Sequence, residues 1–141
     1  MKKVVIIFFG IFLISLGIST CVYANMGIDP GMTFFYGMKN LFHIPLGVTT
    51  LIFNVLFLIP MILFNTKRIG LGTLINMAFV GFFVDIINEI IFKDIVFEGS
   101  IGFHLFILIL GIIVQSLGVV VYSRCNMGQA PLDGIPNVLM H

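Results

Sequence analysis

The residue of this sequence best suited to chemistry is Asp85, an acidic side chain inside the largely apolar residues 72–92. If these residues form a helix, spacings of three and four positions put Gly81, Asn88 and Glu89 on the same face as Asp85. A carboxylate at membrane depth is costly and is typical of an ion or proton pathway. We therefore predict a proton or cation site at Asp85, with Glu89 beside it. The alternative is that the helix lies shifted along its axis, which leaves both acids in the wet interface.

Other polar side chains are scattered through the apolar stretches, namely Ser15, Asn54, Asn76, Gln115 and Ser116. Their usual role would be hydrogen bonding between helices. Three of them, Asn54, Asn76 and Gln115, join the candidate site as potential contributors to a coupling pathway. Because a charge facing lipid costs about 2.5–3.5 kcal/mol at the centre of a span, Asp85 is expected to face the bundle interior. Its expected polar partner is Asn54, Ser15 or Gln115.

Nothing in the sequence predicts an enzyme, a metal site or a cofactor. The two cysteines, Cys21 and Cys125, are far apart and have no metal-binding spacing. The three histidines are isolated, and no grouping of Ser, His and Asp or of Cys and His stands out. We therefore expect no catalytic residues, and we expect both cysteines to be small buried hydrophobes.

The composition places the chain in a lipid bilayer. Of its 141 residues 60% are hydrophobic and 9% charged, and the mean hydropathy is +1.20. A soluble domain of this length needs more polar surface, so the sequence predicts an all-α integral membrane protein. A formal net charge of +1 offers no basic surface for nucleic acid.

Four stretches are long enough to cross a bilayer core, which takes about 20 apolar residues of helix. They are residues 4–23, 46–64, 72–92 and 101–122. This assignment puts five basic residues on one side and two on the other. The first group is Lys2, Lys3, Lys67, Arg68 and Arg124, and the second is Lys39 and Lys93. Because basic residues favour the cytoplasmic side, we expect the N-terminus in the cytoplasm.

An internal repeat organises the chain. Residues 10–30 and 111–131 agree at nine of 21 positions, 101 residues apart. Three predicted spans separate the starts of the two copies, so the copies enter the membrane from opposite faces, as in inverted-topology repeats. We predict one membrane domain over residues 1–141, with a first repeat over 10–100 and a second over 111–141. A cleaved signal peptide is the rival interpretation of the N-terminus, but a removable leader has no reason to be copied.

Each copy of the repeat ends in an elbow of polar, Gly and Pro residues. The first elbow carries Asn25, Gly27 and Pro30 and leads into a short helix over residues 31–43. The second elbow carries Asn126, Gly128, Pro131 and Asp133 and leads into residues 132–141. A counterpart of the span at residue 46 would start beyond the last residue, so the second copy is expected to be cut off. This topology puts Cys21 near the outer face and Cys125 near the inner one, too far apart for a disulfide.

Three passages resemble one bacterial family. They are the elbow at residues 25–30, the run Gly72-Thr73-Leu74-Ile75-Asn76 leading to Gly81 and Asp85, and residues 126–134. They are similar to the YczE/YyaS/YitT group of multi-pass membrane proteins, which have "LG..P.D" elbows and a "GT..N....G...D" third span. The resemblance implies a bacterial cytoplasmic-membrane protein of about six spans, of which this chain is a truncated form, with no assigned reaction. The first elbow departs from the pattern, because only the second keeps the acid, as Asp133.

Two functions from different classes remain open. Inverted repeats with interrupted helices usually frame a transport site, which favours a transporter-like protein for a small molecule or ion, with proton coupling through Asp85. The alternative is a non-transporting accessory protein that holds a partner complex through its apolar faces. Either function leaves the lipid bilayer as the surroundings and allows a homo-oligomer or a partner protein.

Overall fold

The computed structural model describes residues 2–27, 30–65, 71–95 and 99–124, and within these ranges every regular element is helical. The elements are α1 (Lys2–Tyr23), α2 (Pro30–Phe42), α3 (Leu46–Asn65), α4 (Leu71–Ile87), the π-helical turn η2 (Asn88–Phe92) and α5 (Ile101–Ser123). The predicted all-α membrane class is confirmed.

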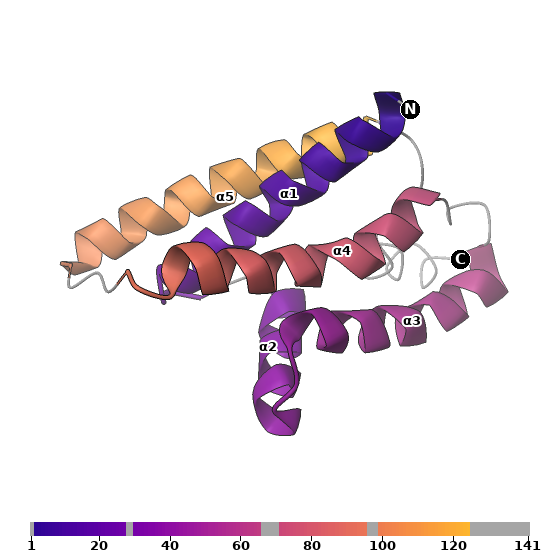
Figure 1. The fold of residues 1–141 in the computed structure, drawn as a ribbon, viewed down its shortest axis with the longest axis horizontal. Coiled ribbons are helices and arrows are strands. Elements are labelled where there is room, and N and C mark those ends of the chain that lie inside the picture. Colours follow the sequence, from indigo (N-terminus) through magenta and orange to yellow (C-terminus); the bar gives the residue numbers. More distant parts are fainter. Residues whose placement is uncertain (1, 28–29, 66–70, 96–98, 125–141) are drawn as a thin grey trace.

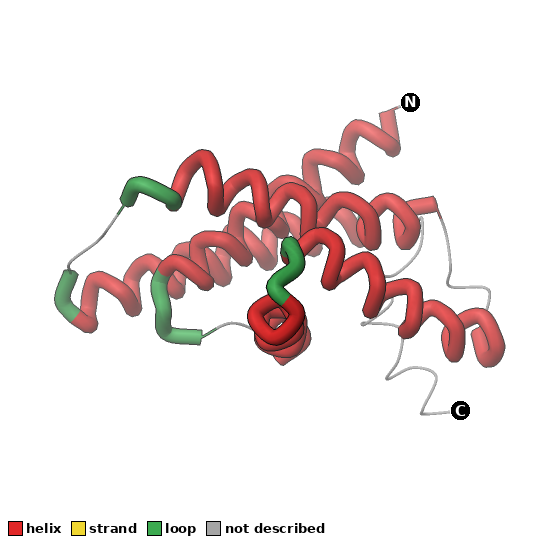
Figure 2. The backbone as a smooth tube through the Cα atoms, turned by 60° about the horizontal axis from the view of Figure 1, so that its bottom comes forward, coloured by secondary structure: helices red, strands yellow, loops and turns green. Residues whose placement is uncertain are grey.

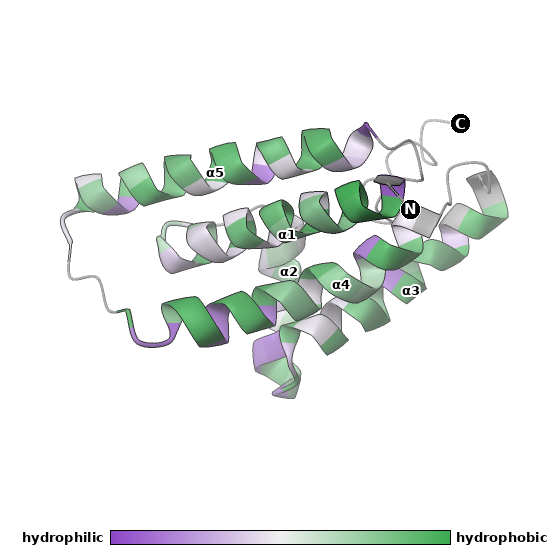
Figure 3. Ribbon diagram, turned by 45° about the horizontal axis from the view of Figure 1, so that its top comes forward, coloured by the Kyte–Doolittle hydropathy of each residue, from purple (hydrophilic) through white to green (hydrophobic). Residues whose placement is uncertain are grey.

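Four long helices lie side by side in the order α5, α1, α4 and α3, and α2 runs across the lower side of this row (Figure 1). Hydrophobic residues dominate all four, and hydrophilic residues gather mainly near helix ends and loops (Figure 3). The core lies along α1, where Ile7, Ile11 and Ile18 are almost fully buried. Much of the apolar surface of these helices remains exposed, and such surface is suited to contact with lipid.

Three helices are long and apolar enough to cross a membrane alone: α1, α4 together with η2, and α5. A fourth span arises if α2 and residues 46–60 of α3 cross as one broken unit, because these two segments are bent by 117°. Figure 2 shows this bend, with α2 viewed nearly end-on and a short loop leading into α3. The expected second span therefore exists as a helix, but it is one arm of a bent pair.

The first elbow forms where the sequence predicts it. Asn25 and Gly27 have φ angles of 53° and 114°, in the left-handed region that ends helices. Pro30 is the first residue of α2, a position where its missing N–H costs nothing. The carbonyl of Ala24 lies 3.1 Å from Nδ1 of His104, so the start of α5 is attached to the elbow. The second elbow, residues 126–133, lies outside the described residues.

The helices α1 and α5 run antiparallel, and their glycines bring the two backbones together. A methyl group added to Gly17 would lie 2.5 Å from the backbone nitrogen of Gln115, and one added to Gly118 would lie 2.6 Å from that of Ile14. Similar limits hold for Gly10 against Tyr122 and for Gly111 against Cys21. Small residues at membrane-helix interfaces permit this close packing. All four glycines belong to the repeat.

The third predicted span changes its winding near one end. The α-helix stops at Ile87 and a π-helical turn continues to Phe92, where the sequence predicts one regular helix. Tyr23 of α1 stacks on Phe92 at 4.7 Å between ring centroids, and its hydroxyl donates to the carbonyl of Ile95. These contacts join the end of α1 to the widened turn. Such turns often occur at functional sites.

Candidate coupling site at Asp85

The Asp85 carboxylate lies at the N-terminus of another helix. Its Oδ2 accepts the backbone N–H of Gly47 at 2.7 Å, and its Oδ1 accepts that of Leu46 at 3.3 Å. The first N–H groups of a helix have no partner within the helix and carry partial positive charge. The carboxylate of α4 therefore accepts hydrogen bonds from the first backbone N–H groups of α3, immediately after the bend.

Lys39 on α2 supplies a third contact. Its Nζ lies 3.9 Å from Oδ1 of Asp85 and 5.4 Å from the centre of the Tyr36 ring. The Lys39 and Asp85 side chains are 34% and 25% exposed, so both members of the pair are only partly buried. The carboxylate consequently connects three elements: α2, α3 and α4.

Two glycines allow the carboxylate to reach these groups. A methyl group on Gly81 would lie 2.6 Å from the Cα of Gly47 and would also collide with the Thr50 hydroxyl. A methyl group on Gly47 would lie 3.1 Å from the Phe82 nitrogen and 3.3 Å from Oδ2 of Asp85. Larger side chains at either position would push α3 away from α4. The close approach of Gly81 to Gly47 thus brings Asp85, one helical turn further along α4, within reach of the start of α3.

Part of the polar face predicted on residues 72–92 is directed at the bend, namely Gly81, Asp85 and Asn88. Asn88 donates from Nδ2 to the hydroxyl of Tyr36 on α2 at 3.0 Å, one helical turn beyond Asp85. Glu89, expected beside Asp85 in the site, is exposed. Asp85 of α4 and Asn88 of η2 therefore both bind α2, and Glu89 lies at the margin.

The expected partners of Asp85 are wrong. Ser15 donates instead to the carbonyl oxygens of Ile11 at 2.9 Å and Val80 at 3.2 Å, so it joins α1 to α4. Gln115 packs against Gly17 on the far side of α1. Asn54 and Asn76 are both buried, at 8% exposure. The partners Lys39, Leu46 and Gly47 were missed because they reach Asp85 only through the bend between α2 and α3.

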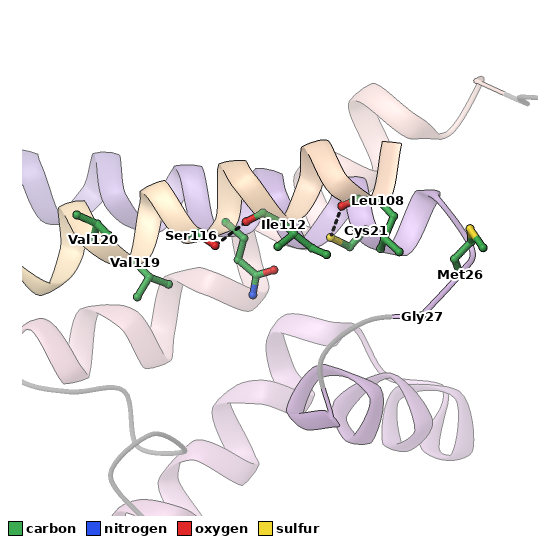
Figure 4. A pocket seen from close by; sticks show the side chains of 9 residues that line it. Cys21, Met26, Gly27, Leu108, Ile112, Ser116, Val119 and Val120 are labelled. Carbon is green, nitrogen blue, oxygen red and sulfur yellow. Dashed lines mark hydrogen bonds between the residues drawn. The ribbon is translucent and has the colours of Figure 1, made fainter. Parts of the chain in front are cut away.

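A hollow on the described residues lies away from Asp85. It measures about 710 Å³ and lies between the end of α1 and one face of α5 (Figure 4). Its lining residues include Cys21, Leu108, Ile112, Gln115, Ser116 and Val119. Cys21 is buried as expected, with its Sγ 3.9 Å from the Leu108 carbonyl oxygen, whereas Cys125 lies outside the described residues. Within the described ranges no group of three His, Cys, Asp or Glu side chains could hold a metal ion.

Comparisons with known proteins agree with this architecture. A family of unknown function, DUF6198, matches residues 1–141. An uncharacterized membrane protein of Bacillus subtilis, YczE, is 28% identical over 91% of this chain and 58% of its own length. An uncharacterized Haemophilus influenzae protein is 23% identical over 95% of this chain and 59% of its own. The chain thus spans less than two thirds of these relatives. No solved structure matches it significantly.

Proposed function

The chain belongs to the DUF6198 family and is an integral membrane protein, and from this premise we propose that it is transporter-like, acting on a small molecule or ion. The observation that carries the proposal is the carboxylate of Asp85 at the break between α2 and α3. Broken helices whose ends meet an ionisable side chain are the usual framework for ion-coupled transport sites. The proposed location is the bacterial cytoplasmic membrane, with the N-terminus in the cytoplasm.

Coupling follows from competition for one carboxylate. Lys39 and the N–H groups of Leu46 and Gly47 are all attracted by the negative charge of Asp85. A proton or cation that binds Asp85 neutralises this charge and weakens all three contacts together. The bent pair of α2 and α3 is then less firmly attached to α4. A charge change at one residue can therefore bias the position of two helices.

The proposed frame for this movement is an inverted repeat, with residues 10–100 as the first copy and residues 111–141 as part of the second. Its support comes from the antiparallel α1 and α5, because Gly10 approaches Gly118 while Gly111 approaches Gly17. Because Gly10 corresponds to Gly111 and Gly17 to Gly118, exchanging the two copies turns each of these contacts into the other. A reciprocal interface of this kind is typical of elements related by a twofold axis.

Ion flux into proteoliposomes tests the proposal. The full chain is reconstituted with a trapped pH-sensitive dye, and a pH step or a gradient of Na⁺ or K⁺ is imposed. We expect flux above that of empty vesicles, lost in Asp85→Asn and retained in Asp94→Asn, an exposed acid just beyond η2. Flux unchanged by Asp85→Asn would remove Asp85 from the mechanism. No flux with any of these ions, in protein that keeps its helical content, would leave the accessory function ahead.

A second candidate is a non-transporting accessory protein that binds another membrane protein. It is favoured by the position of the 710 Å³ hollow, which is lined by α1 and α5 and not by Asp85. In that case the contacts of Asp85 serve only to fix the bend. Co-purification of a defined partner with both the wild-type chain and Asp85→Asn, in the absence of flux, would favour this candidate.

A further inference from the structure

Among the described residues, no helix covers one face of α5, whereas the corresponding face of α1 is covered. In α1, Ile11, Ser15 and Ile18 are buried, at 0%, 0% and 3% exposure. Their counterparts 101 residues later are Ile112, Ser116 and Val119, and all three are exposed, the first at 50%. The two helices therefore differ in what packs on them, although their sequences repeat.

The helix that covers this face of α1 is α4. Phe8 and Phe12 of α1 meet Phe79 and Phe83 of α4 edge-on, with ring centroids 5.0 and 6.0 Å apart. Ser15 adds its hydrogen bond to the carbonyl of Val80. The ring pairs Phe8–Phe79 and Tyr23–Phe92 lie at opposite ends of α1, and their residue numbers rise together, so α4 and η2 run parallel to α1.

The remaining surface of α5 behaves as the repeat requires. Toward α1, contacts occur in exchanged pairs: Gly118 meets Ile14 where Gly17 meets Gln115, and Gly10 meets Tyr122 where Gly111 meets Cys21. The Ser116 hydroxyl donates to the carbonyl of Ile112 at 2.7 Å, as the Ser15 hydroxyl does to that of Ile11. In these contacts α5 is equivalent to α1, except that no described helix packs on α5 where α4 packs on α1.

This face of α5 is also hollowed and partly polar. Ile112, Ser116, Val119 and Val120 line the 710 Å³ hollow together with Gln115 (Figure 4). A hydroxyl and an amide at membrane depth favour contact with protein over contact with lipid tails. The hollow thus has the features of a helix-packing surface.

We propose that the face of α5 formed by Ile109, Ile112, Ser116, Val119 and Val120 docks one further transmembrane helix that repeats α4 and runs parallel to α5. This helix uses its backbone and apolar side chains as α4 does on α1, and one of its carbonyls accepts from Ser116. It comes from the portion of the family's length that this chain does not span, about two fifths of each relative. The inference concerns assembly and does not depend on transport.

Spin-label accessibility tests the docking surface. In a variant whose two cysteines are replaced by alanine, a nitroxide is attached at Ser116→Cys or, as a matched control, at Leu110→Cys. Leu110 is equivalent to Phe9, which stays 57% exposed although α4 packs on α1. Collision with oxygen is measured in bilayers for the chain alone and for the chain continued by the portion of the Bacillus subtilis relative that its match leaves uncovered.

The expected result is loss of oxygen accessibility at position 116 in the continued chain, with no change at position 110. Equal accessibility at position 116 in both forms would overturn the proposal. Protection of position 116 in the chain alone, rising with the ratio of protein to lipid, would overturn it in favour of a second copy.

If the continued chain does not fold, the same portion is co-expressed as a separate tagged polypeptide. It should co-purify with the wild-type chain and with Leu110→Trp but not with Ser116→Trp, and failure to co-purify with the wild type would also refute the proposal.

Discussion

The Oδ2 atom of Asp85 accepts the backbone N–H of Gly47 at 2.7 Å, so a side chain of α4 completes the first turn of α3. Asp85→Asn retains the shape of the side chain but removes its charge and one acceptor. Hydrogen bonds to charged groups contribute about 1.5–3 kcal/mol, and helix caps typically about 1 kcal/mol. We expect the free energy of unfolding in detergent to fall by about 1–2 kcal/mol. Asp94→Asn should change it by less than about 0.5 kcal/mol, as surface substitutions do.

Glycines between α1 and α5 give a second prediction. Gly17→Leu and Gly118→Leu each force a side chain into the backbone of the opposite helix. Overpacking of this kind costs about 1–3 kcal/mol, and both variants should lower the thermal unfolding midpoint by similar amounts. The control is Gly37→Ala, where an added methyl group would have no neighbour within 4 Å. Equal effects in all three variants would contradict close packing of α1 and α5.

Ser15 and Ser116 form a matched pair for a third measurement. Both hydroxyls donate to a carbonyl four residues earlier, but Ser15 also reaches Val80 on α4. Hydrogen bonds between membrane helices contribute about 0.6 kcal/mol on average and about 1.7 kcal/mol at most. Ser15→Ala should therefore lower the free energy of unfolding by about 0.6–1.7 kcal/mol, and Ser116→Ala should leave it nearly unchanged. A larger loss with Ser116→Ala would reverse the assignment.

Topology is tested by labelling single cysteines in intact cells. With the N-terminus in the cytoplasm, an impermeant maleimide should label Lys39→Cys on α2 but not Lys67→Cys, which lies outside the described residues. The native thiol of Cys21 should resist labelling because it is buried at 3% exposure. Oxidation should produce no internal disulfide between Cys21 and Cys125. External labelling at position 67, or such a disulfide, would contradict the predicted topology.

Local signals in the sequence predict the helices well. Apolar runs give the four long helices to within a few residues, and three of them are long and apolar enough to cross a membrane alone. The first elbow follows from Asn25, Gly27 and Pro30, whose backbone preferences end one helix and begin the next. The shared face of Asp85 and Asn88 follows from helical periodicity alone.

The environment of Asp85 was beyond such signals. Its partners depend on a 117° bend that brings Lys39 and the N–H of Gly47 to the same point, and no periodicity encodes an angle between two helices. Asn54, Ser15 and Gln115 were plausible because they are polar and near the expected depth. Helix rotation, set by the glycine contacts, turns Ser15 toward Val80 and Gln115 toward Gly17.

Pairing of α1 with α5 has a consequence for biosynthesis. These helices lie at opposite ends of the described sequence, so the glycine face of α1 has no partner while the rest of the chain is translated. Ribosomes add about 5–20 residues per second, so α1 waits for seconds in the bilayer or in the insertion machinery. Contacts between such distant segments also form slowly. Among the described helices, the pairing of α5 with α1 is therefore the last to form, and any lipid or insertase helix that occupies the face of Gly10 and Gly17 must leave first.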